Sequence, residues 1–330
     1  MVVNIDQNYQ FKVTAMQFLK EQTNFNFMGK RKLAALFSGI LLIASISSLV
    51  IQGLNFGIDF TGGTMIELAY EEEANLDRIR TTLEQNSFES ASVQNFGSIH
   101  EVLIRLPIIE SQNMAELSNE VVATLQAENT TKIDVRRVEF VGPQVGEELT
   151  EQGGLAMLYA LIGILIYVSL RFEYRFAIGS VMALVHDVVL TLGFFSLLQL
   201  EFDLTVLAAI LAVIGYSLND TIVVFDRIRE TFLRMRKGSS EEIVNRALND
   251  TLSRTLMTSV TTLLVVTSLF VFGGEVIHAF SIALMLGIVV GTYSSIYIAS
   301  NTVLSMGISK ADLMPVVKDD DDVSEDGAQV

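Results

Sequence analysis

The most informative part of this sequence is a carboxylate inside an apolar segment. Residues 204–225 are long and apolar enough to cross a hydrocarbon core of about 30 Å, and Asp220 lies among them. A charged side chain inside a membrane costs at least ~2.5 kcal/mol. A position at the membrane surface is the simpler interpretation, but an aspartate is too short to reach far toward water. We therefore favour a functional carboxylate at Asp220.

Polar residues on the same segment and on the next one extend this candidate site. Because residues three and four apart share a helix face, Asn219 and Asp220 lie with Tyr216 on one polar face. Arg254 enters the next apolar segment from the same side, and Thr258 follows one turn later. Arg254 could instead be only the positive flank of that segment, with the threonine packing between helices. Because Asp220 is expected to face Arg254, we favour an ion pair between these two residues.

A second ionisable pair, His186 and Asp187, lies in the middle of another apolar segment. One interpretation is a hydrogen-bonded pair that only holds two helices together. The other is a station in a proton relay, because histidine changes its charge near neutral pH. We expect this pair to tune a proton path without being its central carrier.

Glycines mark the place where the chain leaves the first apolar segment. Residues 57–63 read Gly-Ile-Asp-Phe-Thr-Gly-Gly, and this choice suits a sharp backbone turn with close approach of another chain. A phosphate site is excluded because the glycines precede a predicted strand and not a helix. We predict a hinge formed by Gly57, Asp59, Gly62 and Gly63. Gly287 and Gly291 are spaced as a Gly-x-x-x-Gly motif, which predicts close helix packing.

Composition narrows the class of protein. The chain has 330 residues, is 50% hydrophobic and carries a net charge of −16, which indicates a membrane protein with acidic parts outside the bilayer. It has no cysteine, so disulfides and thiolate metal sites are excluded, and its three histidines are too scattered for a metal cluster. We expect neither a metal nor a cofactor. The acidic balance argues against nucleic-acid binding.

The apolar segments predict six transmembrane helices, at 33–51, 155–170, 176–198, 204–225, 256–272 and 277–304. Lysine and arginine gather before the first helix, after the second and between the fourth and fifth, whereas the loops at 199–203 and 273–275 contain neither. By the positive-inside rule, both termini are cytoplasmic. The basic segment at 226–253 is a cytoplasmic loop, in which Ser239 and Glu242 predict a capping box that opens a short surface helix ending at Asn249.

Between the first two helices lies a polar block of the size of one small domain. Its alternating and helical patterns predict strands at 64–70, 91–96, 101–106 and 132–141, and helices at 72–85 and 111–127. The order βαββαβ is that of a ferredoxin-like α+β domain. The predicted organisation is an N-terminal cytoplasmic segment (1–32), helix one (33–52), an extracytoplasmic domain (53–151), five more helices (152–304) and an acidic cytoplasmic tail (305–330). A turn at 142–146 is expected to lead back into the membrane.

These motifs resemble the SecD/SecF family of protein-export membrane proteins, on its SecF side, within the resistance-nodulation-division superfamily. The most specific pieces are residues 57–63, 183–187 (Ala-Leu-Val-His-Asp), 215–230 and 253–255 (Ser-Arg-Thr). The resemblance covers nearly the whole chain. It implies that Asp220 is the principal proton-carrying carboxylate and that Arg254 and Thr258 occupy its partner positions.

The resemblance also implies a function. A protein of this family uses the proton-motive force, together with SecD, to promote late steps of protein export through the SecYEG channel in the bacterial inner membrane. The implied partners are SecD, SecYEG, YidC, YajC, the translocating preprotein and the lipid bilayer. The coupling ion is expected to be a proton, although sodium is also possible chemically.

Two other classes of function were weighed. A half-size exporter of a lipid or drug belongs to the same superfamily, but such exporters usually carry two large outer domains and twice as many spans. An intramembrane aspartyl protease would use Asp187 and Asp220, since paired carboxylates can share a proton. The neighbouring His186 and the expected Arg254 partner do not favour that dyad. We therefore predict that the chain is not an enzyme.

Overall fold

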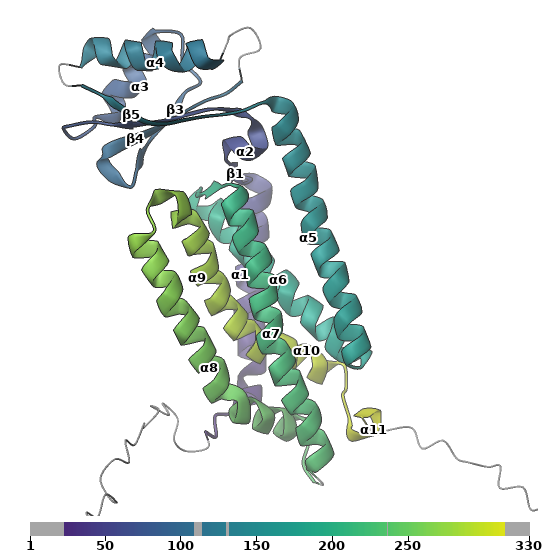
Figure 1. The fold of residues 1–330 in the computed structure, drawn as a ribbon. Coiled ribbons are helices and arrows are strands. Elements are labelled where there is room, and N and C mark those ends of the chain that lie inside the picture. Colours follow the sequence, from purple (N-terminus) through teal and green to yellow (C-terminus); the bar gives the residue numbers. More distant parts are fainter. Residues whose placement is uncertain (1–22, 109–113, 130–131, 236, 314–330) are drawn as a thin grey trace, which may run out of the picture.

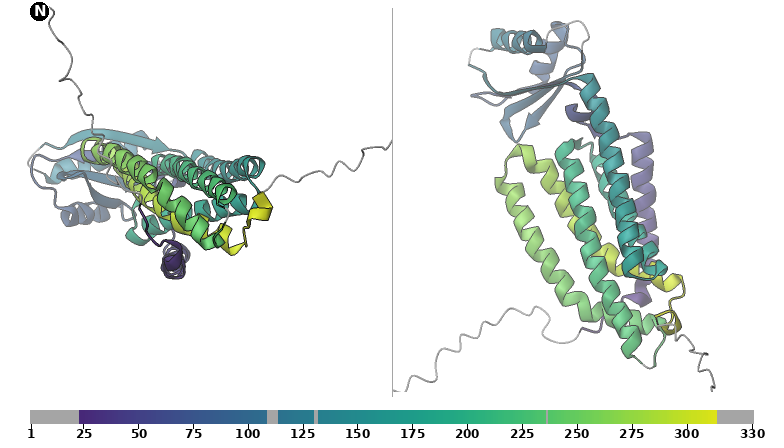
Figure 2. Two further views of the ribbon diagram at one scale, coloured as in Figure 1. Left: turned by 90° about the horizontal axis from the view of Figure 1, so that it is seen from below. Right: turned by 45° about the vertical axis from the view of Figure 1, so that its right-hand side comes forward.

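The computed structural model describes residues 23–108, 114–129, 132–235 and 237–313. A bundle of long helices forms one part of the molecule, and a small α+β domain, called the outer domain here, covers one end of it (Figure 1). Both ends of the described chain lie at the opposite end of the bundle (Figure 2). The predicted tail beyond Leu313 and most of the predicted N-terminal segment fall outside the described residues.

Within the described residues, six helical spans are long and apolar enough to cross a membrane, as predicted. In the two central helices, α6 and α7, 56% and 50% of the residues in the apolar stretch are buried inside the protein. In α1 and α5 only 11% are buried, so these two helices present most of their apolar side chains outward. The spans are α1 (Arg31–Ile51) with a preceding turn η1 (Met28–Lys30), α5 (Pro143–Arg171), α6 (Tyr174–Leu198), α7 (Leu204–Arg234), α8 (Ser240–Phe272), and a composite last span of η2 (Glu275–Ile277), α9 (His278–Ser294), the π-helical segment η3 (Ser295–Ala299) and α10 (Ser300–Ser305).

Three helices, α5, α7 and α8, are longer than the sequence patterns predicted. Helix α7 continues beyond its expected end at Phe225 to Arg234. The expected turn at 142–146 is wrong, because α5 already begins at Pro143, whose missing N–H is not needed in the first helical turn. The capping box of Ser239 and Glu242 is confirmed, but the helix that it opens does not end at Asn249. It continues to Phe272, since no glycine or proline interrupts residues 240–272. The first turns of α8 run across the base of the bundle (Figure 1).

The outer domain contains the six predicted elements in the predicted order. They are β2 (Gly63–Ala69), α3 (Leu76–Gln85), β3 (Ser92–Phe96), β4 (Ser98–Leu106), α4 (Met114–Glu128) and β5 (Asp134–Val141). The strands form an antiparallel sheet in the order β3-β4-β2-β5. Helix α3 starts later than predicted because the Asn75 side chain accepts a hydrogen bond from the Arg78 N–H and caps it. The predicted start of the second helix, at 111, lies outside the described residues.

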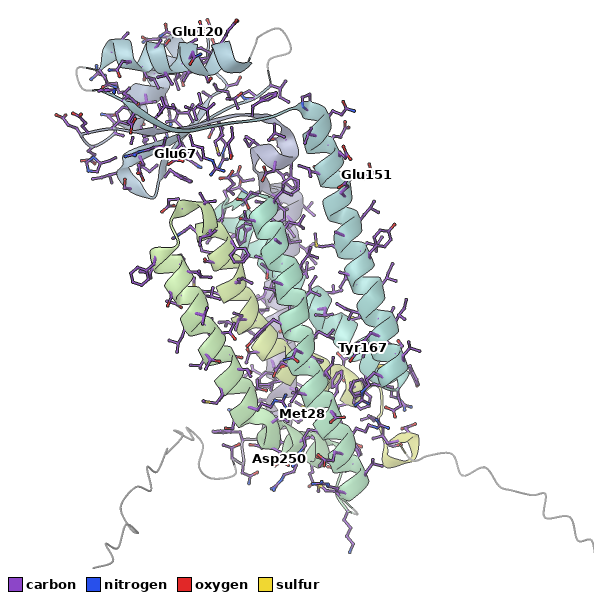
Figure 3. The ribbon with its side chains drawn as sticks, viewed as in Figure 1. Met28, Glu67, Glu120, Glu151, Tyr167 and Asp250 are labelled. Atoms are coloured by element: carbon purple, nitrogen blue, oxygen red, sulfur yellow. The ribbon has the colours of Figure 1, made fainter. Side chains whose placement is uncertain are left out.

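A continuous apolar core joins the sheet to the two helices of the outer domain. The alternate residues Ile66 and Leu68 of β2, and Val102 and Ile104 of β4, point toward Leu83, Leu117 and Leu125 on the helices. All of these side chains are at most 2% exposed. Glu67 and Glu120 lie outside this core (Figure 3). The domain therefore has a core of its own, separate from that of the helical bundle.

Two short elements attach the outer domain to the bundle. Strand β1 (Asn55–Phe56) pairs in parallel with β6 (Glu201–Phe202) in the α6–α7 loop, and the one-turn helix α2 (Ile58–Thr61) follows. The rings of Phe56, Phe60 and Phe202 pack with centroids 5.6–5.8 Å apart. The outer domain is thus joined to the α6–α7 loop by backbone pairing and by apolar contact.

Candidate ion-coupling site

Asp220 is buried in the middle of the bundle and is held by two hydroxyl groups from other helices. Its side chain is 8% exposed. Thr255 of α8 donates a hydrogen bond to Oδ1 (2.6 Å), and Ser295 of η3 donates one to Oδ2 (2.5 Å). A hydroxyl can donate or accept, so the same three side chains can hold either a charged carboxylate or a protonated carboxyl. This is the chemistry that a reversible proton site requires.

Asp187 forms a second buried carboxylate site nearby in the fold. It is 1% exposed, and its Oδ1 lies 3.0 Å from Nδ1 of His186. Its Oδ2 accepts hydrogen bonds from Ser217 of α7 (2.5 Å) and from Ser294 of α9 (2.8 Å). Nε2 of His186 is buried and has no hydrogen-bond partner among the described residues. The predicted pair therefore exists, and it joins α6 to α7 and α9.

Glycines on α9 bring the serines to the two carboxylates. A Cβ atom on Gly287 would lie 2.1 Å from Cγ2 of Val213, and one on Gly291 would lie 3.0 Å from Cβ of Ser217. Only glycine lets α9 approach α7 this closely, so the close packing predicted for this motif is confirmed. One turn later the α-helix widens into the π-helical η3, a feature often found at functional sites. The adjacent Ser294 and Ser295 thereby reach carboxylates on two different helices.

The residues predicted to face Asp220 lie differently. Arg254 is exposed and makes neither a hydrogen bond nor an ion pair with Asp220 in the described part of the chain, although the two charges are close enough to attract. The Thr258 hydroxyl is also exposed and donates to the backbone carbonyls of Arg254 and Thr255. Thr255, one turn earlier, takes the place expected for Thr258. Asn219 is exposed, and among the described hydrogen bonds it is not a partner of Asp220.

A charged cavity of about 500 Å³ opens beside Arg254 at the base of the bundle. Asp250 lines this cavity, at the end of the bundle that is predicted to face the cytoplasm (Figure 3). Its carboxylate pairs with Arg227 (2.6 Å) and with Arg246 (3.3 Å). Arg254 lines this cavity and is exposed.

Of the predicted hinge residues, Gly57 and Asp59 lie against the outer end of α7, whereas Gly62 and Gly63 lie against β5 and β4 of the outer domain. Gly62 and Gly63 have φ angles of 68° and 136°, which an L side chain rarely adopts. Asp59 accepts a hydrogen bond from the Leu204 N–H (3.0 Å), the first N–H of the helix that carries Asp220, whose N-cap is Asp203. A Cβ atom on Gly57 would lie 2.9 Å from Oε1 of Glu201. The segment 57–63 therefore runs from the outer end of α7 to the outer domain, as the junction between them.

An ion pair at this junction had no sequence signal. Arg105 of β4 pairs with Glu201 of β6, and their side chains are 11% and 22% exposed. Burial raises the pKa of Glu201. The charge of Arg105 lowers this pKa in part, whereas the charges of Asp203 and Asp59 raise it. The pair links residues almost a hundred positions apart, so only the folded chain reveals it.

Sequence reasoning also missed the hydroxyl donors Thr255, Ser295, Ser217 and Ser294. Each is a small polar residue within an apolar span. The adjacent Ser294 and Ser295 gave no stronger signal than other hydroxyl pairs, such as Thr261 and Thr262 on α8. Small polar residues also serve helix packing generally, so their types alone could not distinguish the two roles.

Comparisons with known proteins agree with this architecture. The family model described as "Protein export membrane protein SecD/SecF, C-terminal" matches residues 121–309, and the model "SecD/SecF GG Motif" matches residues 47–74. The Protein translocase subunit SecF of Vibrio alginolyticus is 54% identical over 299 residues, which cover 91% of this chain and 95% of the relative. That of Escherichia coli O157:H7 is 44% identical over 306 residues, with coverages of 91% and 95%.

A solved structure has a similar fold. The crystal structure of SecDF, a translocon-associated membrane protein from Thermus thermophilus, aligns with a TM-score of 0.78 and 39% sequence identity. The alignment covers 86% of this chain and 39% of the SecDF chain, so the present chain corresponds to less than half of that longer protein.

Proposed function

The chain belongs to the SecD/SecF family of protein-export membrane proteins, and we propose that it acts as the SecF subunit of a protein translocase. It works with SecD in the cytoplasmic membrane, where proton flow drives late steps of protein export through SecYEG. The observation that carries this proposal is the buried Asp220, held by hydroxyls from α8 and η3. The family match supplies the setting in which that site acts.

Asp220 couples protons to helix movement. A charged carboxylate at this depth is expensive, so it must be either hydrogen-bonded and near a positive charge or protonated. The charged form favours short hydrogen bonds to Thr255 and Ser295 and attraction to Arg254. The protonated form loses that attraction. Because a proton then binds the two helix arrangements with different affinity, it shifts the balance between them, as any driven conformational change requires.

The movement reaches the outer domain through the α7 junction. The α7 helix carries Asp220 near its middle, and Asp59 accepts a hydrogen bond from the Leu204 N–H at its outer end. A shift of α7 therefore acts directly on the residues that precede the outer domain. This domain has the strand order of a ferredoxin-like fold and lies on the extracytoplasmic side, while both termini are cytoplasmic. Gly62 and Gly63 let it change its orientation, so the predicted hinge role is part of this proposal.

SecD covers the polar edge of the bundle. Asn219, Arg254 and Thr258 are exposed at membrane depth in the isolated chain, and polar groups in such positions normally face protein or water. The similarity to SecDF, which is a single longer chain, supports a second membrane protein at this edge. Arg254 would then lie between the two subunits and close to Asp220. YidC, YajC and the translocating preprotein complete the proposed set of partners.

The substitution Asp220→Asn tests the proposal. It mimics the neutral carboxyl at nearly the same volume, so the protein should fold, insert and bind SecD. Export that depends on the proton-motive force should be lost, while ATP-driven translocation by SecA should persist at a reduced rate. Asp226→Asn is the matched control, because Asp226 lies on the same helix but is exposed and pairs only loosely with Arg171 (3.6 Å). Full proton-dependent export by Asp220→Asn membranes would refute the proposal.

A further inference from the structure

A short segment ahead of the first membrane helix is fixed to the base of α8. Residues 23–30, here called the N-terminal strap, lie along the first turns of that helix, and Met28 marks their position in Figure 3. Neither the ion-coupling site nor the junction with the outer domain uses these contacts. The strap therefore needs an explanation of its own.

Two asparagines one helical turn apart hold the strap by its backbone. Asn249 accepts a hydrogen bond from the Phe25 N–H (2.8 Å) and donates one to the Phe25 carbonyl (2.9 Å). Asn245 donates to the same carbonyl (3.0 Å) and accepts from the N–H groups of Phe27 (2.7 Å) and Met28 (3.3 Å). An asparagine amide carries the same donor and acceptor as a peptide group, so it can pair with a strap residue as a neighbouring strand would.

Side chains at the C-terminal end of the strap add further contacts. Met28 is 0% exposed and packs in the apolar cluster that contains Val244, Ala247 and Leu248 of α8. The Phe27 ring meets Tyr297 of η3 edge to face, with centroids 6.1 Å apart. Arg31, at the start of α1, pairs with Glu241. The strap thus joins three elements: α1, the base of α8, and η3.

Both hydroxyl donors to Asp220 lie on elements that the strap holds. Thr255 follows Asn249 by six residues on the unbroken helix α8, a rise of about 9 Å. Ser295 lies two residues before Tyr297 on η3. We propose that Asn245 and Asn249 are positioning residues, which clamp the strap and thereby fix Thr255 and Ser295 against Asp220. This inference rests on the proposed proton-coupling role of Asp220.

The inference predicts a specific consequence of releasing the strap. With the base of α8 unclamped, the Thr255 hydroxyl is no longer held at hydrogen-bond distance from Asp220. Hydrogen bonds to a carboxylate set the balance between its charged and protonated forms. The pH at which export is half-maximal should therefore change. A loss of structural support alone would lower export by the same factor at every pH and leave this midpoint where it was.

Two variants release the strap in different ways. The double variant Asn245→Ala/Asn249→Ala removes the clamp from α8. Phe25→Pro leaves α8 intact and removes the hydrogen bond that the Phe25 N–H donates to Asn249, because proline has no backbone N–H. Asn129→Ala is the control. Asn129 directly follows α4 in the outer domain, and in the described contacts its side chain donates a hydrogen bond only to the Leu125 carbonyl of that helix. The first measurement is hydrogen exchange at the amides of residues 25–28 in the full chain with SecD.

We expect exchange at the Phe27 amide to rise about five- to tenfold in both strap variants, the ratio for the loss of roughly one net hydrogen bond. The pH midpoint of proton-dependent export should move in both variants and stay unchanged in Asn129→Ala. Unchanged exchange, or faster exchange with an unmoved midpoint, would overturn the inference. Asp220→Asn measured in parallel separates the two ideas: if it exports normally, the proposed function fails, whereas the exchange result still decides whether the asparagines hold the strap.

Discussion

The ion pair between Arg105 and Glu201 allows a quantitative test of how the outer domain is held. Arg105→Met keeps most of the apolar stem of the side chain and removes its charged guanidinium. The carboxylate of Glu201 is then left 22% exposed, with the acidic Asp59 and Asp203 as its charged neighbours. We expect the contact between β4 and the α6–α7 loop to weaken, because an unpaired carboxylate at this site gains from exposure to water.

The structure sets the expected magnitude. Removing one partner of a fully buried ion pair costs about 3–5 kcal/mol, whereas exposed pairs contribute about 0–1 kcal/mol. The side chains of Arg105 and Glu201 are partly exposed, so we expect a cost of about 1–3 kcal/mol in the free energy of docking. This corresponds to roughly a 5- to 150-fold change in the docking equilibrium.

Hydrogen exchange at the Gly57 amide is the assay, because this N–H donates to the Phe202 carbonyl across the junction (2.9 Å). Exchange should rise in Arg105→Met by the factor just given. The double variant Arg105→Met/Glu201→Gln should recover much of the protection, since it removes the unpaired charge as well. Arg136→Met is the control, because Arg136 and its partner Asp134 are both more than half exposed.

The pH dependence supplies the refuting result. A carboxyl whose pKa is raised in the docked state gives its full contribution at pH values below its ordinary pKa and loses it as the pH rises through the raised value. Burial raises the pKa of Glu201, and removal of Arg105 takes away the group that lowers it. The defect of Arg105→Met should therefore shrink as the pH falls. A defect that is independent of pH, or that Glu201→Gln does not relieve, would show that the pair does not hold the junction.

Four further predictions test the hinge, the second carboxylate site, the topology and the C-terminal contact. Gly62→Ala should destabilise the chain by about 2–4 kcal/mol in thermal unfolding, because the φ angle of Gly62 is 68° and a Cβ atom there would lie 2.5 Å from Ile108. Gly154→Ala is its control and should be neutral or slightly stabilising, because a Cβ atom on Gly154 would have nothing within 4 Å. His186→Asn should shift the pH profile of export and retain part of the activity, whereas complete loss in a folded, SecD-binding protein would make His186 an essential carrier. Since the chain has no cysteine, Ser92→Cys should react with an impermeant thiol reagent from outside and Ser240→Cys should not; the opposite pattern would reverse the topology. Hydrogen bonds from Ser309 and Arg175 lower the pKa of Asp312 to about 2, so the contact of α11 (Lys310–Leu313) with α6 should hold above pH ~4 and be lost as the pH falls toward ~2; a cross-link at this contact that forms equally well at pH ~2 would contradict this.

The sequence by itself determined the elements of this protein. Six apolar runs of membrane-spanning length, and two periodicities in the polar block, were sufficient to predict the six helices and the βαββαβ order, because both patterns are local. It also singled out Asp220 and the pair of His186 and Asp187, since an ionisable group in an apolar run stands out without any knowledge of its neighbours. The glycines at 62 and 63 were likewise readable, because positive φ angles restrict the residue type at single positions.

The partners of these residues were decided only by the tertiary structure. Which hydroxyl meets Asp220 depends on the rotation and height of α8 beside α7. Thr255 and Thr258 lie three residues apart on α8, but only Thr255 is buried and reaches the carboxylate. Ser294 and Ser295 reach their carboxylates because two glycines let α9 approach α7 and because the helix widens at η3. The pair of Arg105 and Glu201 and the clamp of Asn249 on Phe25 join residues about a hundred or more positions apart. Such contacts follow from the packing of whole elements, which no local pattern encodes.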